Sequence, residues 1–449
     1  MSYATDKKWE NLRYFPSDLM KVYKKVPKHP EKIKAIQDRK VQELMKIAYE
    51  IPFYRERFER SGTKPEDYRC GEDLSKFPVL TKEELRDWSD EELEKNPEKY
   101  KDWHISPTSG STGVPLRTPF SPKENAWVKA NFMRSVMMAG FIPGVHKCLH
   151  RPNSLHTVTG GKKSLSQRIV DSRWKDMSDA IKERVPSQVL LQEINAYKPD
   201  YLYMHKNILV RVCLYAKRNR MYLHKPKWYS PISEMLDPSS AQLLEEMLGP
   251  GLINPYGLSE TGTAAVQLPG EDFFRVNSDT HVVNLRADAG SYGDEGVAII
   301  TPLFKTDFPL INYVTGDRMD GRMVNGLREI TTIRGRMNDV IHHRDGKITE
   351  WGNLEVVVNY AVGLGVVQSR FIQESYDQIR IQAVKDPNCH LSLPEIEKQY
   401  TAAFAPALNN EFHFVYEWMD EIPSDPNGKL RMIVNNMPAP DAKTESAAQ

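Results

Sequence analysis

The alternation of short apolar runs with amphipathic segments over residues 201–248 is the feature that most limits the folds open to this chain. An apolar run at 201–203 precedes a helical pattern at 208–216, and a second helical pattern follows at 240–248. Strands that alternate with helices predict α/β layers. Strand patterns dominate later in the chain, at 297–301, 310–314 and 330–333. We therefore expect an α/β fold.

Longer helices are predicted upstream of this alternation. Apolar residues recur at steps of three and four over 33–51, and Pro52 is expected to stop that helix. A second helix is predicted over 124–139, with Gly140 as its cap. Helical periodicity returns over 171–197.

Length, charge and cysteine content bound the class of protein. A chain of 449 residues exceeds what one core usually organises, so two or more domains are expected. The net charge of +1 gives no electrostatic footprint for nucleic acid or an anionic membrane, so neither partner is expected. The four cysteines have no CxxC spacing, which fits a reducing cytoplasm. The start of the chain shows no signal-peptide core, and the apolar run at 356–367 is too short to span a bilayer.

A polar loop at 106–115 has the composition of an anion site. Residues 108–113 contain two glycines and four hydroxyl side chains. Glycine lets the backbone approach a ligand closely, and free N–H groups with hydroxyls form a concavity suited to phosphate. No lysine follows the second glycine, so this is not a Walker loop. A clamp over nucleotide phosphates and a plain Gly/Ser surface loop both stay open.

A second polar string, at 254–262, could meet a nucleotide in four ways. Tyr256 could stack on a base, and Gly257 could let the base sit close. Ser259 could bond a phosphate, and Glu260 could hold Mg²⁺, which commonly uses one or two carboxylates plus substrate phosphates. The structural alternative is a strand followed by a turn.

Three further strings each have a structural alternative when taken singly. Asp317 directly follows a predicted strand and a glycine, where carboxylates often accept ribose hydroxyls, although a β-turn would explain it too. The arginines and glycine within 333–341 fit an interdomain hinge or a hairpin turn. Lys429 leaves a Pro-Asn-Gly turn, where a solvated loop lysine is the alternative.

In this order and spacing the strings resemble the core motifs of the adenylate-forming superfamily, which includes acyl- and aryl-CoA ligases, luciferases and peptide-synthetase adenylation domains. The resemblance runs from about residue 104 to about residue 434. Within the superfamily the chain is most similar to the phenylacetate–CoA ligase branch and its capsule-biosynthesis relatives. The short length, the helical start at 51–55 and the segment 307–317 carry that likeness. The branch usually has Arg where this chain has Asn312.

The resemblance implies a large N-terminal α/β domain of several subdomains, residues 1–337, and a small mobile α+β C-terminal domain, residues 338–437. The small domain would rotate about Asn338 between two half-reactions and would carry the catalytic Lys429. Residues 438–449 are predicted to form a disordered tail from their Ala-, Pro- and Ser-rich composition.

The resemblance also assigns roles to individual residues. The loop would hold the β- and γ-phosphates of ATP, and Asp317 would accept both ribose hydroxyls, with Arg336 nearby. Glu260 would bind Mg²⁺, and Lys429 would bridge the substrate carboxylate and the α-phosphate. The residues implied to bind ATP are Thr108, Ser109, Gly110, Ser111, Thr112, Gly113, Ser233, Glu234, Tyr256, Gly257, Ser259, Asp317 and Arg336.

The implied activity is ATP- and Mg²⁺-dependent conversion of a carboxylic acid, aromatic and phenylacetate-like, to an acyl-AMP with release of pyrophosphate. Transfer to CoA would then give a thioester. An ammonium and a metal ion aimed at the developing charge are natural catalysts for this chemistry. Transfer to an amine or to a carrier-protein thiol is the first alternative, and a non-catalytic nucleotide-binding relative is the second. Relatives are often dimers, which leaves a homodimer open.

The chain differs from the phenylacetate–CoA ligase branch in the segments that would bind the acid and the acceptor. The acyl pocket would include His156, Val158 and Gly160, in a stretch more polar than is usual. His156 could bond a hydroxyl or amino group of an aryl acid, or face solvent. The loop that helps form the thiol tunnel in the branch has no counterpart at 345–355. Some relatives bind zinc through cysteines that flank a histidine, but His281 has no cysteine neighbour, so Mg²⁺ is the only metal expected.

Overall fold

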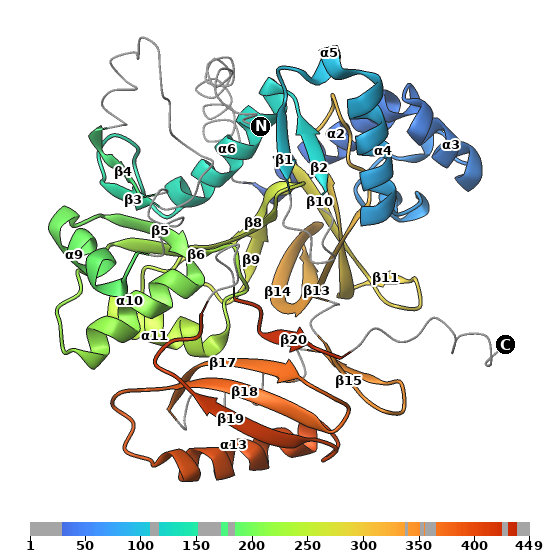
Figure 1. Ribbon diagram of the computed structural model, residues 1–449. Helices are drawn as coiled ribbons and strands as arrows, with labels where there is room; N and C mark the ends of the chain where they lie inside the picture. The colour runs from blue at the N-terminus through green and yellow to red at the C-terminus, as the bar shows by residue number, and fades with distance from the viewer. Residues whose placement is uncertain are drawn as a thin grey trace.

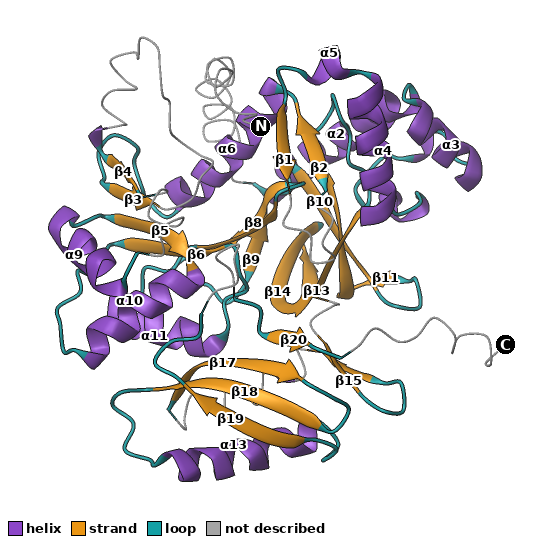
Figure 2. Ribbon diagram, viewed as in Figure 1, coloured by secondary structure: helices purple, strands orange, loops and turns teal. Residues whose placement is uncertain are grey.

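The protein is described by a computed structural model that covers residues 29–107, 116–150, 172–177, 185–336, 340–350, 354, 365–423 and 430–437. Its elements form a large N-terminal domain and a smaller C-terminal domain with a sheet of its own (Figure 1). Helices and strands are mixed throughout, so the predicted α/β class is confirmed (Figure 2). Within the described residues, no helix is both long and apolar enough to cross a membrane.

Most helices of the N-terminal domain begin at a proline, whose fixed φ and missing N–H suit the first helical turn. They are α2 (Pro30–Tyr49), α3 (Pro52–Ser61), α4 (Lys82–Lys95), α5 (Pro97–Tyr100), α6 (Pro122–Met138), α9 (Ser187–Tyr197), α10 (Lys206–Arg218) and α11 (Pro238–Leu248), with 3₁₀ turns at Pro65–Asp67 and Glu72–Lys76. The helices predicted over 33–51 and 124–139 are confirmed as α2 and α6. Pro52 begins α3 two residues after a C-cap at Glu50.

An antiparallel sheet of eight strands dominates the N-terminal domain. Its strands are β7 (Asn254–Leu258), β8 (Gly262–Gln267), β9 (Phe274–Val276), β10 (His281–Arg286), β11 (Tyr292–Gly293), β12 (Glu295–Pro302), β13 (Tyr313–Val324) and β14 (Leu327–Arg336). They are ordered β11-β10-β12-β13-β14-β9-β8-β7. Three strands therefore separate β7 from β13 along the sheet.

A parallel sheet of four strands carries α9, α10 and α11 (Figure 2). It consists of β3 (Cys148–His150), β4 (Trp174–Asp176), β5 (Tyr201–His205) and β6 (Trp228–Ile232), ordered β4-β3-β5-β6. The helix predicted over 171–197 is wrong in its first part, because β4 pairs with β3 there. Helical periodicity does not register a three-residue strand whose partner lies far away in sequence. Two further strands, β1 (His104–Pro107) and β2 (Arg117–Phe120), pair as a hairpin.

The C-terminal domain has a mixed sheet ordered β19-β18-β17-β20. Its strands are β17 (Val366–Gln373), β18 (Gln378–Lys385), β19 (His413–Trp418) and β20 (Ile433–Asn435). Helix α13 (Leu393–Ala407) covers the face turned away from the N-terminal domain (Figure 1). The hairpin of β15 (Val340–His342) and β16 (Ile348–Glu350) precedes this sheet. The predicted boundary at 337/338 and the tail at 438–449 lie outside the described residues.

One apolar cluster joins the two domains. It includes buried residues of α9, α10 and α11 together with residues of β17, β18 and α13. Helix α11 contacts β17 directly. The C-terminal domain therefore rests on the helices that cover the parallel sheet.

A buried ion pair ties α6 to the eight-stranded sheet. Arg134 Nη1 donates to both carboxylate oxygens of Asp279, at 2.8 and 2.9 Å. The two side chains are only 4% and 7% exposed. Because neither charge reaches solvent, each depends on the other.

Replacing Arg134 with leucine is expected to destabilise the N-terminal domain by about 3–5 kcal/mol, because Asp279 would be left as a buried charge without its arginine. Urea unfolding followed by tryptophan fluorescence measures this loss. Arg39→Leu is the control, since the Arg39–Glu43 pair is exposed and a much smaller effect is expected. Equal losses in the two variants would contradict the assigned role of the buried pair.

Candidate active site

Glu260 lies in the tight turn that joins β7 to β8. The turn closes at Gly262, whose φ of +71° favours glycine. A Cβ on Gly257 would lie 2.4 Å from the carbonyl oxygen of Gly262, so no side chain fits there. The Glu260 side chain is directed inward, and the residue is 6% exposed. The turn therefore presents a carboxylate on a closely packed backbone.

Two tyrosines hold the site carboxylates in a reciprocal arrangement. The Tyr313 hydroxyl of β13 donates to Glu260 Oε1 at 3.0 Å. The Tyr256 hydroxyl of β7 donates to Asp317 Oδ2 of β13 at 2.7 Å. Burial and the nearby Glu260 carboxylate raise the pKa of Tyr313, so its hydroxyl stays protonated and can donate. These bonds require the sheet to curl until β7 meets the beginning of β13.

The backbone before Asp317 is fixed by its neighbours. The Asp317 N–H donates to Thr315 Oγ1 at 3.0 Å, and Gly316 has a φ of +78°. Asp317 is 6% exposed and lies opposite Arg336 in the β13–β14 register. Only the backbone of Arg336 is described.

Asn312 occupies the position at which the phenylacetate–CoA ligase branch usually has Arg. Its φ is +54°, a left-handed conformation that asparagine tolerates better than most residues. Its side-chain amide donates to the carbonyls of Leu74 and Phe77, at 2.6 and 2.9 Å. Here the residue anchors the start of β13 to the N-terminal segment, one position before Tyr313.

Ser233 and Glu234 follow β6 at the carboxyl edge of the parallel sheet, where ligands of α/β sheets commonly bind. Ser233 is exposed and has a φ of +72°. The Glu234 carboxylate is instead directed into the protein, 3.9 Å from Lys206 Nζ. Lys206 Nζ also donates to Asp237 at 2.8 Å. The two neighbouring candidates therefore face different surroundings.

The strand that leaves the polar loop is anchored by residues that sequence reasoning missed. Lys305 Nζ donates to the Pro119 carbonyl at 2.9 Å, and burial lowers the pKa of Lys305 to about 8. Glu124 accepts the backbone N–H groups of Asp307 and Phe308, at 2.9 and 3.1 Å. Ser121 and Glu124 form a capping box at the start of α6, which was the one signal visible in the sequence.

His281 supports the Glu260 turn at Thr261. The imidazole is fully buried, and its Nε2 lies 3.0 Å from the Thr261 carbonyl, which can only accept. Its Nδ1 lies 3.0 Å from the Thr280 hydroxyl. Burial lowers the pKa of His281 to about 4, so the ring is neutral near pH 7. Among the described residues, no group of three or more His, Cys, Asp and Glu side chains could hold a metal ion.

Several predicted site residues fall outside the described residues. The β1–β2 register ends at the pair Pro107–Arg117, so the polar loop connects these two strands. The residues outside the description are Thr108, Ser109, Gly110, Ser111, Thr112, Gly113, His156, Val158, Gly160, Asn338 and Lys429. Of the remaining candidates, the structure brings Tyr256, Glu260 and Asp317 together.

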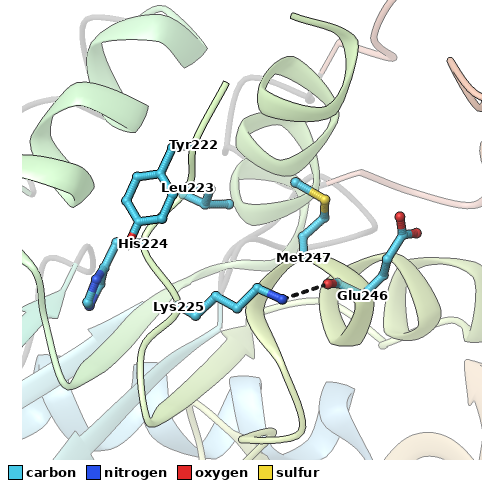
Figure 3. A pocket seen from close by; sticks show the side chains of 6 residues that line it. All are labelled: Tyr222, Leu223, His224, Lys225, Glu246 and Met247. Atoms are coloured by element: carbon cyan, nitrogen blue, oxygen red, sulfur yellow. Dashed lines mark hydrogen bonds between the residues drawn. The ribbon is translucent and has the colours of Figure 1, made fainter. Parts of the chain in front are cut away.

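A surface cavity of about 490 Å³ lies at the other end of β6, away from these residues. The connection from α10 to β6 and the end of α11 form it (Figure 3). Lys225 Nζ donates to the Glu246 carbonyl across it at 3.4 Å. Its lining contains no predicted site residue and consists of Tyr222, Leu223, His224, Lys225, Glu246 and Met247.

The fold is that of the adenylate-forming CoA ligases. The chain superposes on 2-hydroxyisobutyryl-CoA ligase in its postadenylation state with 2-HIB-AMP at a TM-score of 0.70, covering 97% of this chain and 94% of the other at 18% identity. With the same enzyme in its thioesterification state with 2-HIB-AMP and CoA, the coverage is again 97% and 94%, but the TM-score is 0.56.

In sequence, the chain is a relative of CapK and of the phenylacetate–CoA ligases. Residues 341–436 match the CapK C-terminal domain family. CapK of Staphylococcus aureus is 26% identical over 256 residues, and that match spans 55% of this chain and 55% of CapK. The phenylacetate-coenzyme A ligase of Aromatoleum evansii is 26% identical over 335 residues, 69% of this chain and 72% of the ligase. The resemblance predicted from the motifs is confirmed.

The low pKa of His281 predicts acid-sensitive packing around the Glu260 turn. The unfolded state takes up a proton at the ordinary pKa of 6.5, whereas the folded state resists protonation down to about 4. Stability should therefore fall as the pH drops from 6.5 towards 4. Arg134, Asp279 and Lys40 are the charged groups that face the ring.

His281→Gln keeps an N–H donor for Thr261 but cannot titrate. Its melting temperature is expected to fall less steeply over this pH range than that of the unsubstituted protein. Differential scanning fluorimetry between pH 4.5 and 7.5 checks this. Parallel profiles would show that other groups control the acid response.

Proposed function

We propose that this protein is an AMP-forming acid–thiol ligase. It would use ATP to convert a carboxylic acid to an acyl-AMP, with release of pyrophosphate, and then form a thioester with CoA. The observation that carries this proposal is the meeting of two segments that lie far apart in the sequence. Tyr256 and Glu260 of one segment bind Asp317 and Tyr313 of the other through two tyrosine–carboxylate hydrogen bonds. An aromatic, phenylacetate-like acid is the proposed substrate class.

Asp317 suits the proposed ribose contact. A carboxylate accepts hydrogen bonds through both of its oxygens, which makes Asp317 a chemically suitable partner for the two hydroxyls of a ribose. The preceding Gly316 and the Thr315 hydroxyl fix its backbone. Tyr256 would orient Asp317 while its ring flanks the adenine. Gly257, which has no side chain, would let the adenine lie close to the backbone. Ser233 at the sheet edge and Arg336 would complete this side of the site.

The chemistry of Glu260 fits Mg²⁺. It offers a hard oxygen donor on a tight turn, and the Tyr313 hydroxyl orients the carboxylate through Oε1. Mg²⁺ is usually held by one or two carboxylates together with substrate phosphates and water. The ion would neutralise phosphate charge as the acid attacks. Tyr313 would direct the Glu260 carboxylate, and His281 would hold the carbonyl of the next residue.

The remaining contacts would come from Ser259, an exposed residue of the β7–β8 turn, and from residues outside the described ranges. The hydroxyls and amides of 108–113 would bind the β- and γ-phosphates, and Ser259 would contact the α-phosphate. The ammonium group of Lys429 would contact both the acid carboxylate and the α-phosphate, and so would offset the repulsion between these two anions. His156, Val158 and Gly160 would line the acid pocket, and a small domain pivoting at Asn338 would shield the acyl-AMP from water.

The names of several relatives support CoA as the acceptor. Phenylacetate-coenzyme A ligases of four organisms match between 64% and 69% of this chain. Amine and carrier-protein acceptors remain outcomes that product analysis would reveal. A cytoplasmic location and a homodimer also stay predictions.

The function is tested by acid-dependent exchange of labelled pyrophosphate into ATP across a panel of aryl and alkyl acids. Product analysis with CoA, amines and carrier protein then identifies the acceptor. Lys429→Ala is expected to abolish exchange while ATP still binds by calorimetry. A panel in which no acid gives exchange or AMP would reject the proposal, and near-normal exchange by Lys429→Ala would remove that residue from the mechanism.

Glu260→Gln and Tyr313→Phe should weaken the response to Mg²⁺ to different extents. Loss of the Glu260 charge is expected to reduce adenylation by roughly 10²–10³. Tyr313→Phe leaves the carboxylate but removes the bond that directs it, so the Mg²⁺ concentration for half-maximal rate should rise with a smaller loss at saturating Mg²⁺.

Titrations of Mg²⁺ in the exchange assay, and of Mn²⁺ binding by electron paramagnetic resonance, measure both effects. Tyr229→Phe is a matched control because Tyr229 is buried beside Leu252, within the parallel sheet. An unchanged metal requirement in Tyr313→Phe would contradict the positioning role of its hydroxyl.

A further inference from the structure

Lys206 is a buried lysine that contacts both domains. It is the first residue of α10 and is 1% exposed. Its Nζ lies 2.8 Å from Asp237 and 3.9 Å from Glu234, both in the N-terminal domain. The same atom lies 4.0 Å from the sulfur of Met432, in the C-terminal domain. A buried ammonium requires compensation, and the two carboxylates supply it.

Met432 belongs to the short segment that follows Lys429. Its carbonyl accepts the Phe371 N–H at 2.8 Å, and the Arg370 Nε donates to the Arg431 carbonyl at 3.1 Å. Leu430 and Met432 are both buried. This segment is therefore fixed to β17 on one side and meets Lys206 on the other.

The contact continues along one face of α10. Asn207 Oδ1 accepts from Gln368 at 2.7 Å, and Arg211 pairs with Glu421 at 2.9 Å. Farther along the helix, Arg218 pairs with Asp420 at 3.0 Å. Residues spaced by four and seven positions share one face of a helix. Asn207, at the N-terminal end of this face, is buried, as is the adjacent Lys206. Of the acidic partners farther along, Glu421 is partly exposed and Asp420 is almost fully exposed.

Lys206 also reaches the turn beside the proposed nucleotide site. Glu234 directly follows Ser233, the residue at the carboxyl edge of the parallel sheet. Asp237 caps α11 by accepting the Ser240 N–H at 2.9 Å. One ammonium therefore joins the turn after β6, the cap of α11 and the segment that follows Lys429.

We propose that Lys206 is a positioning residue that sets the C-terminal domain, and with it Lys429, in the arrangement for acyl-AMP formation. This rests on the proposed function. At equal coverage, the chain superposes better on the postadenylation state of 2-hydroxyisobutyryl-CoA ligase than on its thioesterification state, with TM-scores of 0.70 and 0.56. The contacts of Lys206 are therefore assigned to the arrangement that resembles the postadenylation state. Their loss is expected to slow acyl-AMP formation more than transfer to CoA.

The test uses the double variant Lys206→Met/Asp237→Asn. It removes both charges of the Lys206–Asp237 pair together, and asparagine still caps α11. The melting temperature reports any cost of leaving the Glu234 carboxylate without Lys206. Single-turnover acyl-AMP formation from ATP is measured in one assay, and transfer from supplied acyl-AMP to CoA in another. The ratio of the two rates is expected to shift against acyl-AMP formation by roughly tenfold, within the usual range of pairwise coupling.

Lys34→Met is the matched control. Lys34 pairs with Asp38 and Glu72 inside the N-terminal domain, at 2.6 and 2.9 Å, so its loss should leave the ratio unchanged. A double variant that keeps its melting temperature and slows both reactions equally, or neither, overturns the positioning role.

A distance measurement separates this proposal from the proposed function. Spin labels are placed at the exposed positions of Tyr222→Cys and Tyr376→Cys, one in each domain, with Cys70 and Cys389 replaced by serine. Double electron–electron resonance is expected to give a broader or displaced distance distribution in the Lys206→Met/Asp237→Asn background. An unchanged distribution overturns the proposal even in an active enzyme. A changed distribution in a protein that activates no acid supports the domain contact but rejects the proposed function.

Discussion

The crossed hydrogen bonds between two tyrosines and two carboxylates are the constraint on which the site depends. Tyr256 reaches Asp317 across 61 residues of sequence, and Tyr313 reaches Glu260 across 53. The bonds join β7 and the turn after it to the first part of β13, which lies four positions from β7 in the sheet order. An unmade bond at such a buried acceptor costs about 1–3 kcal/mol, so sheet curvature and site geometry stabilise each other. A phenol also donates without adding positive charge, which suits the roles proposed for these carboxylates towards a cation and a ribose.

The surroundings of this turn are held by backbone contacts more than by surface charges. His281 holds the Thr261 carbonyl, Lys305 holds the Pro119 carbonyl, and Asn312 holds two carbonyls of the N-terminal segment. Each of these side chains is buried, where polar groups require a partner. Lys206, at the contact between the domains, is likewise a buried polar side chain that has partners. Catalysis that aligns anionic groups benefits from such preorganised surroundings, because little reorganisation remains for the reaction itself.

The sequence motifs selected residues that the structure brings together. Tyr256, Glu260 and Asp317 were selected from the sequence because they belong to short polar segments that follow apolar runs. The structure places these three residues close together. The helices at α2 and α6 were readable because their apolar period is regular over many residues. The first part of 171–197 was misread, because β4 is defined by its pairing with β3 and not by its own pattern. Lys305 gave no signal and His281 was considered only as a zinc ligand, since the role of a single lysine or histidine depends on the residues around it.

The sequence by itself determined the α/β class, the family likeness and the residue types that can meet a nucleotide, because these depend on local periodicity and on short strings of neighbouring residues. It could not determine that Tyr313 directs Glu260, that Glu234 turns away towards Lys206, or that Asn312 takes over an anchoring position at β13. The tertiary structure decided these points. They depend on which distant backbones come within hydrogen-bonding distance, and the curl of one sheet and the seat of the C-terminal domain on α10 fix those distances.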